Sequence, residues 1–181
     1  IDYNEPYGTV MEPYKRGYYF GGWYTEKNGG GTKIYSSTIY NIDGDSTVYA
    51  KWIPAIYRVN LDANGGTLSN NIKTVEYMQP YGALRVPKRE EYEFDGWYTE
   101  RDGGTRVYSS TIYNIAGNST LYAHWTEMSY RVIFNGNGAT PSFYYKKLRY
   151  MEQYGTLPKV QRNGYYFLGW YTKSNVGTRV N

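Results

Sequence analysis

The sequence predicts a mainly β protein built as a tandem array of three small four-stranded modules. An aromatic-rich segment occurs three times, at residues 17–25, 91–99 and 164–172. Its tryptophans, Trp23, Trp97 and Trp170, lie 74 and then 73 residues apart, a spacing too regular for chance in so short a chain. Short runs of alternating apolar and polar residues, bounded by Gly and Asn, are typical of half-buried strands. The 25 Tyr, 5 Phe and 5 Trp can fill the small cores of such modules.

The repeat divides the chain into three predicted modules joined by short linkers. Repeat 1 lacks its first strand, repeat 2 is complete and repeat 3 lacks its last strand; they span residues 1–52, 57–125 and 130–181. The linkers, residues 53–56 and 126–129, leave little room for independent tumbling. We therefore expect an elongated, semi-rigid rod.

Repeat 2 opens with a predicted β-hairpin. Residues 57–62 alternate apolar and polar, and the following Ala-Asn-Gly-Gly tolerates the positive φ of a turn. A second strand follows around residues 72–77. We expect the same strand at residues 1–3 in repeat 1 and at residues 148–150 in repeat 3.

A connection of about nine residues, 83–91, comes next. It contains Pro87, and its counterparts contain Pro13 and Pro158, so the sequence disfavours a long helix and allows one turn. The aromatic segment then forms the third strand. The glycine runs that follow it precede no helix and are predicted to be hairpin turns.

The third strand leaves two interpretations open for its tryptophans. Positions 93 and 95 vary among the copies, from Glu and Asp to Tyr and Leu, and are predicted to face solvent. Strict alternation places Trp23, Trp97 and Trp170 on that same face, where they could stack on sugar rings or contact a partner. Alternatively, the preceding glycines, Gly22, Gly96 and Gly169, mark a bulge that returns each Trp to the core. We favour the bulge and retain the tryptophans as candidate ligand-binding residues.

The last part of the repeat contains one ambiguous segment and one clear strand. Residues 108–118 have apolar residues at helical spacing but also β-branched residues, so they are predicted to be irregular or one to two helical turns. Residues 120–125, matched by 47–52, form the fourth strand. Alternation places Leu121, Ala123 and Trp125 on one face and Tyr122 and His124 on the other.

Five elements in fixed order give the chain a specific family resemblance. They are Val-x-Leu-x-x-Asn-Gly-Gly, Tyr-Gly, Pro followed by basic residues, the aromatic segment and Leu-Tyr-Ala-x-Trp, at residues 59–66, 81–82, 87–89, 91–99 and 121–125. Together they resemble the Listeria-Bacteroides repeat, the internalin B-repeat type of module. The chain departs from the pattern at residues 90–91 and 137–139. The resemblance implies an α+β, β-grasp-like fold in a non-enzymatic stalk of a secreted or cell-wall-attached bacterial adhesin.

Repeat 3 differs from the other two repeats in charge. Repeats 1 and 2 each have a formal net charge of −1, whereas repeat 3 has +7. Its second strand, residues 144–150, is basic and flanked by tyrosines. Alternation places Lys147 and Arg149 on one face with Tyr145 beside them. This face could bind teichoic acid, sulfated glycan or another polyanion. The competing interpretation is a solvated strand edge that lysine protects against aggregation.

No catalytic, cofactor or metal site is predicted. The chain has one histidine, His124, which repeat 1 replaces by Lys51, and no cysteine. Residues 43–45 resemble the start of a calcium loop, but the spaced acidic ligands that should follow are missing. No nucleophile with a plausible base is present, and repeat 3 does not preserve the acidic pairs of repeat 2. Neither a nucleic-acid motif nor an apolar run long enough to span a membrane is found.

Three functions remain from these observations. The first is a spacer, and the second is a module in which basic repeat 3 binds an anionic polymer. The third is an accessory domain that holds a catalytic head on carbohydrate, which requires exposed tryptophans. The expected partners are host or cell-wall glycans, anionic polymers or a protein receptor. Because repeats 1 and 3 expose unpaired strand edges, head-to-tail self-association is a further expectation.

Overall fold

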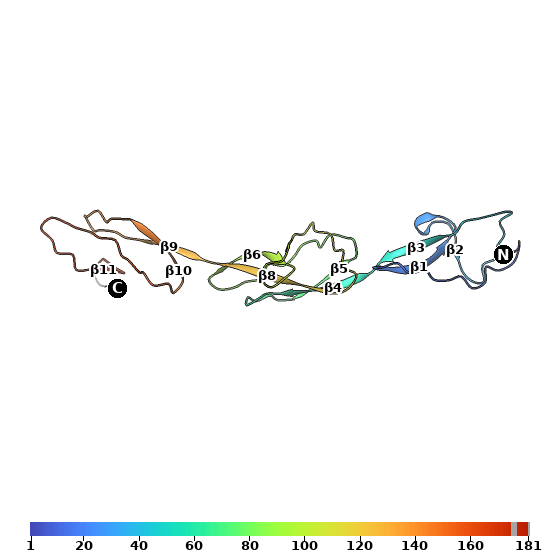
Figure 1. Ribbon diagram of the computed structural model, residues 1–181, viewed down its shortest axis with the longest axis horizontal. Helices are drawn as coiled ribbons and strands as arrows, with labels where there is room; N and C mark the ends of the chain where they lie inside the picture. Colours follow the sequence, from blue (N-terminus) through green and yellow to red (C-terminus); the bar gives the residue numbers. More distant parts are fainter. Residues whose placement is uncertain (175–176, 181) are drawn as a thin grey trace. The chain divides into compact units, whose positions relative to one another are not determined.

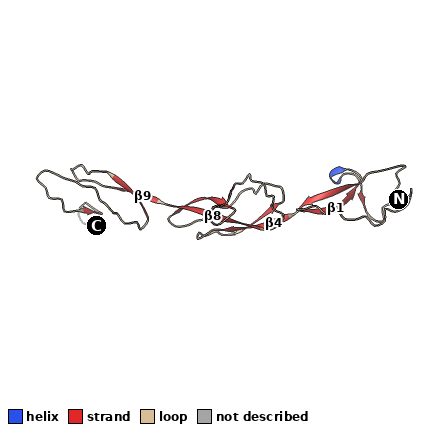
Figure 2. Cartoon of the chain, in the orientation of Figure 1, coloured by secondary structure: helices blue, strands red, loops and turns tan. Residues whose placement is uncertain are grey.

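The computed structural model describes residues 1–174 and 177–180 (Figure 1). Within them the chain is mainly β, as predicted, with one three-residue 3-10 helix, η1 (Lys27–Gly29), and no α-helix (Figure 2). Two compact units are present: Ile1–Lys88 with Gly96–His124, and Arg89–Asp95 with Trp125–Asn181. The sheets belong to the individual repeats and are described one repeat at a time.

Repeat 2 contains a five-stranded sheet with the order β5-β4-β8-β6-β7. Its strands are β4 (Ile56–Asp62), β5 (Ile72–Glu76), β6 (Tyr92–Tyr98), β7 (Arg106–Val107) and β8 (Ser119–Glu127). β4 and β5 form the predicted antiparallel hairpin. β4 also pairs in parallel with β8, with Val59 opposite Ser119. The first and last long strands of the repeat are therefore neighbours in the sheet.

The core of repeat 2 follows the predicted alternation of β4 and β8. Val59 and Leu61 are buried on β4, and Leu121 and Ala123 are buried on β8, each at most 1% exposed. Tyr122 and His124 are only half-buried, on the opposite face of β8. The period-two pattern therefore identified the inward face at Leu121 and Ala123, whereas Trp125, predicted on the same face, is half-buried.

The segment 108–118 forms no helix and contributes the largest fully buried side chain, Tyr113. Its backbone N–H donates a hydrogen bond to the carbonyl of Gln79 (2.9 Å), and its hydroxyl donates to the carbonyl of Gly117. The ring packs edge-on against Tyr81, with centroids 5.3 Å apart. Burial raises the pKa of both Tyr113 and Tyr81. Of the two predicted alternatives, the segment is therefore irregular and not helical, and it packs Tyr113 against Tyr57 of β4 and against Tyr81.

Repeat 1 has a three-stranded sheet, order β2-β1-β3, of β1 (Tyr18–Tyr24), β2 (Lys33–Ile34) and β3 (Tyr49–Pro54). The pairing of β1 with β3 shifts register between Phe20 and Gly22, and Gly22 has a φ of +117°. This is the β-bulge that the glycine suggested. The strand predicted at residues 1–3 is wrong, because those residues pair with no strand in the described part of the chain.

Repeat 3 contains β9 (Ser129–Ile133), β10 (Tyr145–Arg149), β11 (Trp170–Tyr171) and β12 (Arg179–Val180). β9 and β10 form the expected hairpin, but the third strand predicted at 164–172 is reduced to two residues. In the other repeats this strand is held by β3 or β8, and no described strand pairs with residues 165–168. As a result Tyr166 is 96% exposed and Leu168 is 73% exposed.

The first linker is a continuation of the strands and not a loop. β3 ends at Pro54 and β4 begins at Ile56, so only Ala55 separates them, and it is buried. Its N–H donates to the carbonyl of Gly17, and its carbonyl accepts from the N–H of Tyr77, both at 2.9 Å. The two repeats are therefore joined by backbone hydrogen bonds as well as by the chain.

Side chains close this first junction with apolar contacts. Gly17 has a φ of +80°, and a Cβ there would lie 2.4 Å from the ring of Tyr77. The Tyr77 ring packs edge-on against Tyr18, with centroids 5.4 Å apart. Lys15 lies over the same Tyr18 ring at 4.2 Å. Glycine is required because the ring occupies the space of any side chain at this position.

The second junction keeps the backbone hydrogen bond to the start of the third strand and changes the side chains. Only Met128 separates β8 from β9, and its N–H donates to the carbonyl of Glu91 (2.8 Å). Glu91 stands where repeat 1 has Gly17 and retains a left-handed φ of +63°. Its carboxylate accepts a hydrogen bond of 2.5 Å from the hydroxyl of Tyr130. Tyr150, the counterpart of Tyr77, is 61% exposed.

Candidate functional site

The β9–β10 hairpin presents one buried face and one exposed, cationic face. Leu148 on β10 is buried, and neighbouring Lys146 is half-buried with its Nζ donating to the carbonyl of Tyr154 (2.5 Å). The alternate residues point away from this core. We call these exposed residues the basic ribbon face; they are Arg131, Ile133, Tyr145, Lys147 and Arg149.

The structure brings together the three site residues predicted on this strand and adds Arg131 to them. Arg131 lies directly opposite Lys147 in the antiparallel register, and Ile133 lies opposite Tyr145. The guanidinium of Arg131 lies over the Tyr145 ring, 4.1 Å from its centroid. Sequence reasoning missed Arg131 as a site residue because the partner of Lys147 depends on the hairpin register. Counting back from the predicted turn could have identified it.

The cations of the basic ribbon face differ in how far they are neutralised. Arg149 forms an ion pair with Glu127 at 3.1 Å, in which both side chains are substantially exposed. The ion pair between Arg101 and Asp62 lies in repeat 2, and no ion pair to Arg131 or Lys147 is found among the described residues. Arg131 and Lys147 therefore have no carboxylate partner within the described part of the chain, and their charge is available to a ligand.

None of the three tryptophans follows strict alternation. A bulge precedes Trp23, and Gly96 and Gly169, which precede the other two, have φ values of +146° and +131°. Trp97 and Trp170 are buried, at 2% and 8% exposure, and Trp23 is half-buried. Each indole N–H donates to a backbone carbonyl twelve residues earlier: those of Met11 (3.1 Å), Arg85 (2.8 Å) and Pro158 (3.0 Å). The rings thus fix the proline-containing connection onto the third strand, and their burial counts against a stacking role.

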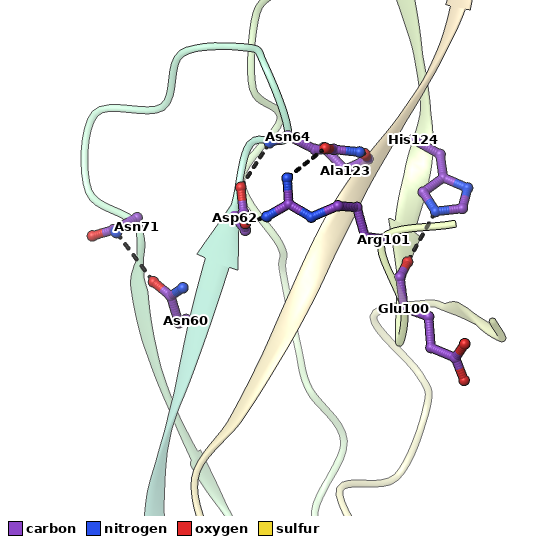
Figure 3. A network of polar contacts seen from close by, with 8 residues as sticks. All are labelled: Asn60, Asp62, Asn64, Asn71, Glu100, Arg101, Ala123 and His124. Carbon is purple, nitrogen blue, oxygen red and sulfur yellow. Dashed lines mark hydrogen bonds and ion pairs between the residues drawn. The ribbon is translucent and has the colours of Figure 1, made fainter. Parts of the chain in front are cut away.

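A polar network closes the turn end of the repeat 2 sheet (Figure 3). Arg101 reaches from the loop after β6 to Asp62 at the end of β4 (2.8 Å) and to the side-chain oxygen of Asn64 (3.3 Å). The amide nitrogen of Asn64 donates to the carbonyl of Ala123 on β8 (3.0 Å). These contacts connect β4, β8 and the loop after β6, so the network has a clear structural role.

His124 belongs to the same end of the sheet. Its ring stacks on Tyr98 with centroids 3.8 Å apart and planes 8° from parallel. Its Nε2 lies 3.0 Å from the carbonyl oxygen of Glu100 (Figure 3). The described residues contain no group of three or more His, Asp or Glu placed to hold a metal ion. No helix among them is long and apolar enough to cross a membrane.

Comparison with known proteins identifies the repeat. The sequence pattern of the Listeria-Bacteroides repeat domain matches residues 1–51, 57–124 and 130–181. Internalin H of Listeria monocytogenes is 35% identical over 124 residues, which cover 68% of this chain and 22% of that protein.

Two proteins of Evansella cellulosilytica are also similar. One, provisionally named a Gly-rich membrane protein, is 30% identical over 139 residues, covering 77% of this chain and 16% of its own length. The other, provisionally named a membrane protein, is 29% identical over 179 residues, covering 95% of this chain and 26% of its own length. The chain therefore spans about a quarter or less of the length of the curated relatives it matches.

Proposed function

Because this chain belongs to the Listeria-Bacteroides repeat family, we propose that it is a non-enzymatic spacer in a secreted or cell-wall-attached bacterial surface protein. The names of its relatives, an internalin and two membrane proteins, support a place at the cell envelope. The chain matches only about a quarter or less of each relative, which is consistent with a spacer segment within a longer protein.

Strand continuity across the junctions is the observation that carries the proposal. β3 passes into β4 and β8 passes into β9 with one residue between them. At each junction that residue hydrogen-bonds to the backbone at the start of the preceding third strand, at Gly17 or Glu91. Junctions of this kind resist bending more than flexible linkers do, which is what a spacer requires.

The sheet order of repeat 2 supports a β-grasp-like topology for the spacer unit. Its hairpin strand β4 lies beside the last long strand, β8, in parallel, and β6 lies on the other side of β8. We propose that the irregular segment containing Tyr113 takes the place that a helix occupies in a helix-containing version of this arrangement.

Small-angle X-ray scattering of the whole chain tests the extended form. A compact domain of this length has a radius of gyration of about 16 Å, and an unfolded chain one of about 45 Å. We expect a value clearly between these two and a rod-like distance distribution. A radius near 16 Å would contradict the spacer proposal.

Distance measurements test the stiffness of the first junction. The chain has no cysteine, so exposed Asp43 and Asp102 can be changed to cysteine and spin-labelled as a unique pair. We expect one narrow distance distribution between repeats 1 and 2. A broad distribution would mean that the repeats move independently and would overturn the semi-rigid form.

A further inference from the structure

We propose that the basic ribbon face of repeat 3 binds an anionic polysaccharide. In this proposal Arg131, Lys147 and Arg149 bind its phosphate or sulfate groups, and Tyr145 with Ile133 packs against its sugar rings. The inference goes beyond the spacer function, because a spacer can carry this site but does not need it.

The same hairpin in repeat 2 shows that the fold does not require these charges. There the equivalent face has Arg58 opposite Thr74, with Glu76 two residues further along β5. Repeat 3 replaces Thr74 by Lys147 and Glu76 by Arg149 while keeping the pairing of the strands. One cation and one anion have thus become three cations on a hairpin with the same strand pairing.

The arrangement of these cations works against the stability of the hairpin. Lys147 and Arg131 are directly opposite each other, and like charges in that position destabilise a strand pair. A lysine that only protects a strand edge against aggregation needs no second cation across from it. A bound polyanion would remove the repulsion, which is why we infer a ligand.

The spacing of the charges fits a polymer better than a single small anion. Residues two apart on a strand are separated by about 7 Å, and opposite residues by about 5 Å. Lys147 and Arg149 therefore form a row along β10, with Arg131 beside it on β9. Successive anionic groups of one chain can follow this row, and each added contact strengthens binding.

Apolar surface lies at one end of the row of cations. It favours a ligand in which sugar rings separate the anionic groups. Tyr145 is 50% exposed and continues the row beyond Lys147, while Ile133 opposite it is 71% exposed. Arg131 holds the Tyr145 ring on one side, at 4.1 Å. Tyrosine combines an apolar ring with a polar hydroxyl, a combination suited to the mixed surface of a sugar.

The test measures binding of the whole chain to immobilised polymers at 0.15 M salt. Heparin supplies sulfate groups on sugars, and poly(ribitol phosphate) supplies phosphate groups between sugar-derived units, so the two probes distinguish the anion. Linear polyphosphate supplies charge without sugar, and neutral dextran supplies sugar without charge. We expect heparin or poly(ribitol phosphate) to bind most tightly, polyphosphate more weakly and dextran not at all.

Charge-reversal variants locate the site. Arg131→Glu with Lys147→Glu should weaken binding roughly tenfold or more and flatten its salt dependence, because two anion contacts are lost. Arg58→Glu with Lys88→Glu removes the same charge from exposed positions of repeat 2 and should leave binding unchanged. The milder pair Arg131→Gln with Lys147→Gln, checked for folding by circular dichroism, should also weaken binding.

Three results would overturn the proposal. An equal loss of affinity in the repeat 2 control variant would show that the polymer responds to the net charge of the chain and not to a specific site. If polyphosphate bound as tightly as the polysaccharides, sugar would make no contribution to binding. If both pairs of repeat 3 substitutions left the affinity unchanged, the basic ribbon face would not be the binding site. Conversely, Tyr145→Ala should reduce binding to the polysaccharides but not to polyphosphate.

Discussion

The two junctions between repeats share one backbone hydrogen bond to the start of the third strand and differ in the side chains around it. At the first, Gly17 admits the ring of Tyr77, which packs on Tyr18. At the second, Glu91 occupies the glycine position, and Tyr150 is largely exposed. From this comparison we infer that the residue at the glycine position controls whether a tyrosine of the next hairpin packs at the junction.

The second junction substitutes polar contacts for the lost apolar ones. The Glu91 carboxylate accepts from Tyr130, and Glu127 pairs with Arg149. A side chain held at a left-handed φ costs about 1–2 kcal/mol relative to glycine. We therefore expect the second junction to be less stable than the first and more sensitive to pH and salt.

Introducing glutamate, the residue found at the second junction, into the first junction should have the largest effect on stability. Gly17→Glu introduces left-handed strain and displaces the Tyr77 ring, and we expect it to cost about 2–4 kcal/mol. Amide hydrogen exchange of Ala55 and Tyr77 reports this locally and should accelerate. Gly17→Ala should show most of the same loss, and unchanged exchange in both variants would contradict the steric argument.

Truncating the two equivalent tyrosines should give unequal results. Tyr77→Ala removes an edge-on aromatic pair and should cost about 1–2 kcal/mol. Tyr150→Ala changes an exposed ring and should stay within about 0.5 kcal/mol. Urea unfolding of the two variants makes the comparison, and similar losses would mean that Tyr150 contributes contacts at the second junction after all.

Giving the second junction a glycine should bring it closer to the first. Glu91→Gly relieves the strained φ but removes the hydrogen bond from Tyr130, so we expect a net change within about 1 kcal/mol. The informative readout is structural: Tyr150 should pack on Tyr92, giving contacts between their rings by NMR. If Tyr150 stays mobile in solvent, the side chain of Glu91 is not what excludes it.

The second junction should also weaken in alkali. The hydrogen bond to Glu91 raises the pKa of Tyr130 above its ordinary value of 10.0. A folded-state pKa above the unfolded one gives a stabilisation that is complete below pH 10 and lost as pH rises through the folded value. Tyr81 and Tyr113 also titrate late, so absorbance titration should show one late tyrosine fewer in Tyr130→Phe than in the unchanged chain. An unchanged number of late tyrosines would contradict the assignment to Tyr130.

Removing the ion pair at the second junction should have the smallest effect on stability, and salt should abolish it. The Arg149–Glu127 pair is largely exposed, and such pairs contribute about 0–1 kcal/mol. We expect Glu127→Gln to cost less than about 0.5 kcal/mol at low salt and nothing measurable at 1 M salt. A larger cost that persists at 1 M salt would show that Glu127 acts through something other than this ion pair.

The sequence by itself determined the features that depend on order along the chain. The spacing of the tryptophans gave the three repeats, and alternation identified the buried face of β8, with Leu121 and Ala123. The Asn-Gly-Gly turn gave the β4–β5 hairpin. Charge counting pointed to Lys147 and Arg149. The predicted buried face and hairpin hold because periodicity and turn chemistry are local properties, whereas the binding role of Lys147 and Arg149 stays a prediction.

Only the tertiary structure decided the features that depend on which segments meet. It placed Tyr113 in the core, turned the predicted linkers into continuous strands and shortened the third strand of repeat 3. It also set Arg131 opposite Lys147, which completed the candidate site. Strand pairing and register join residues that are distant in sequence. Whether a segment forms a strand therefore depends on a partner strand elsewhere in the chain, which the local sequence pattern does not reveal.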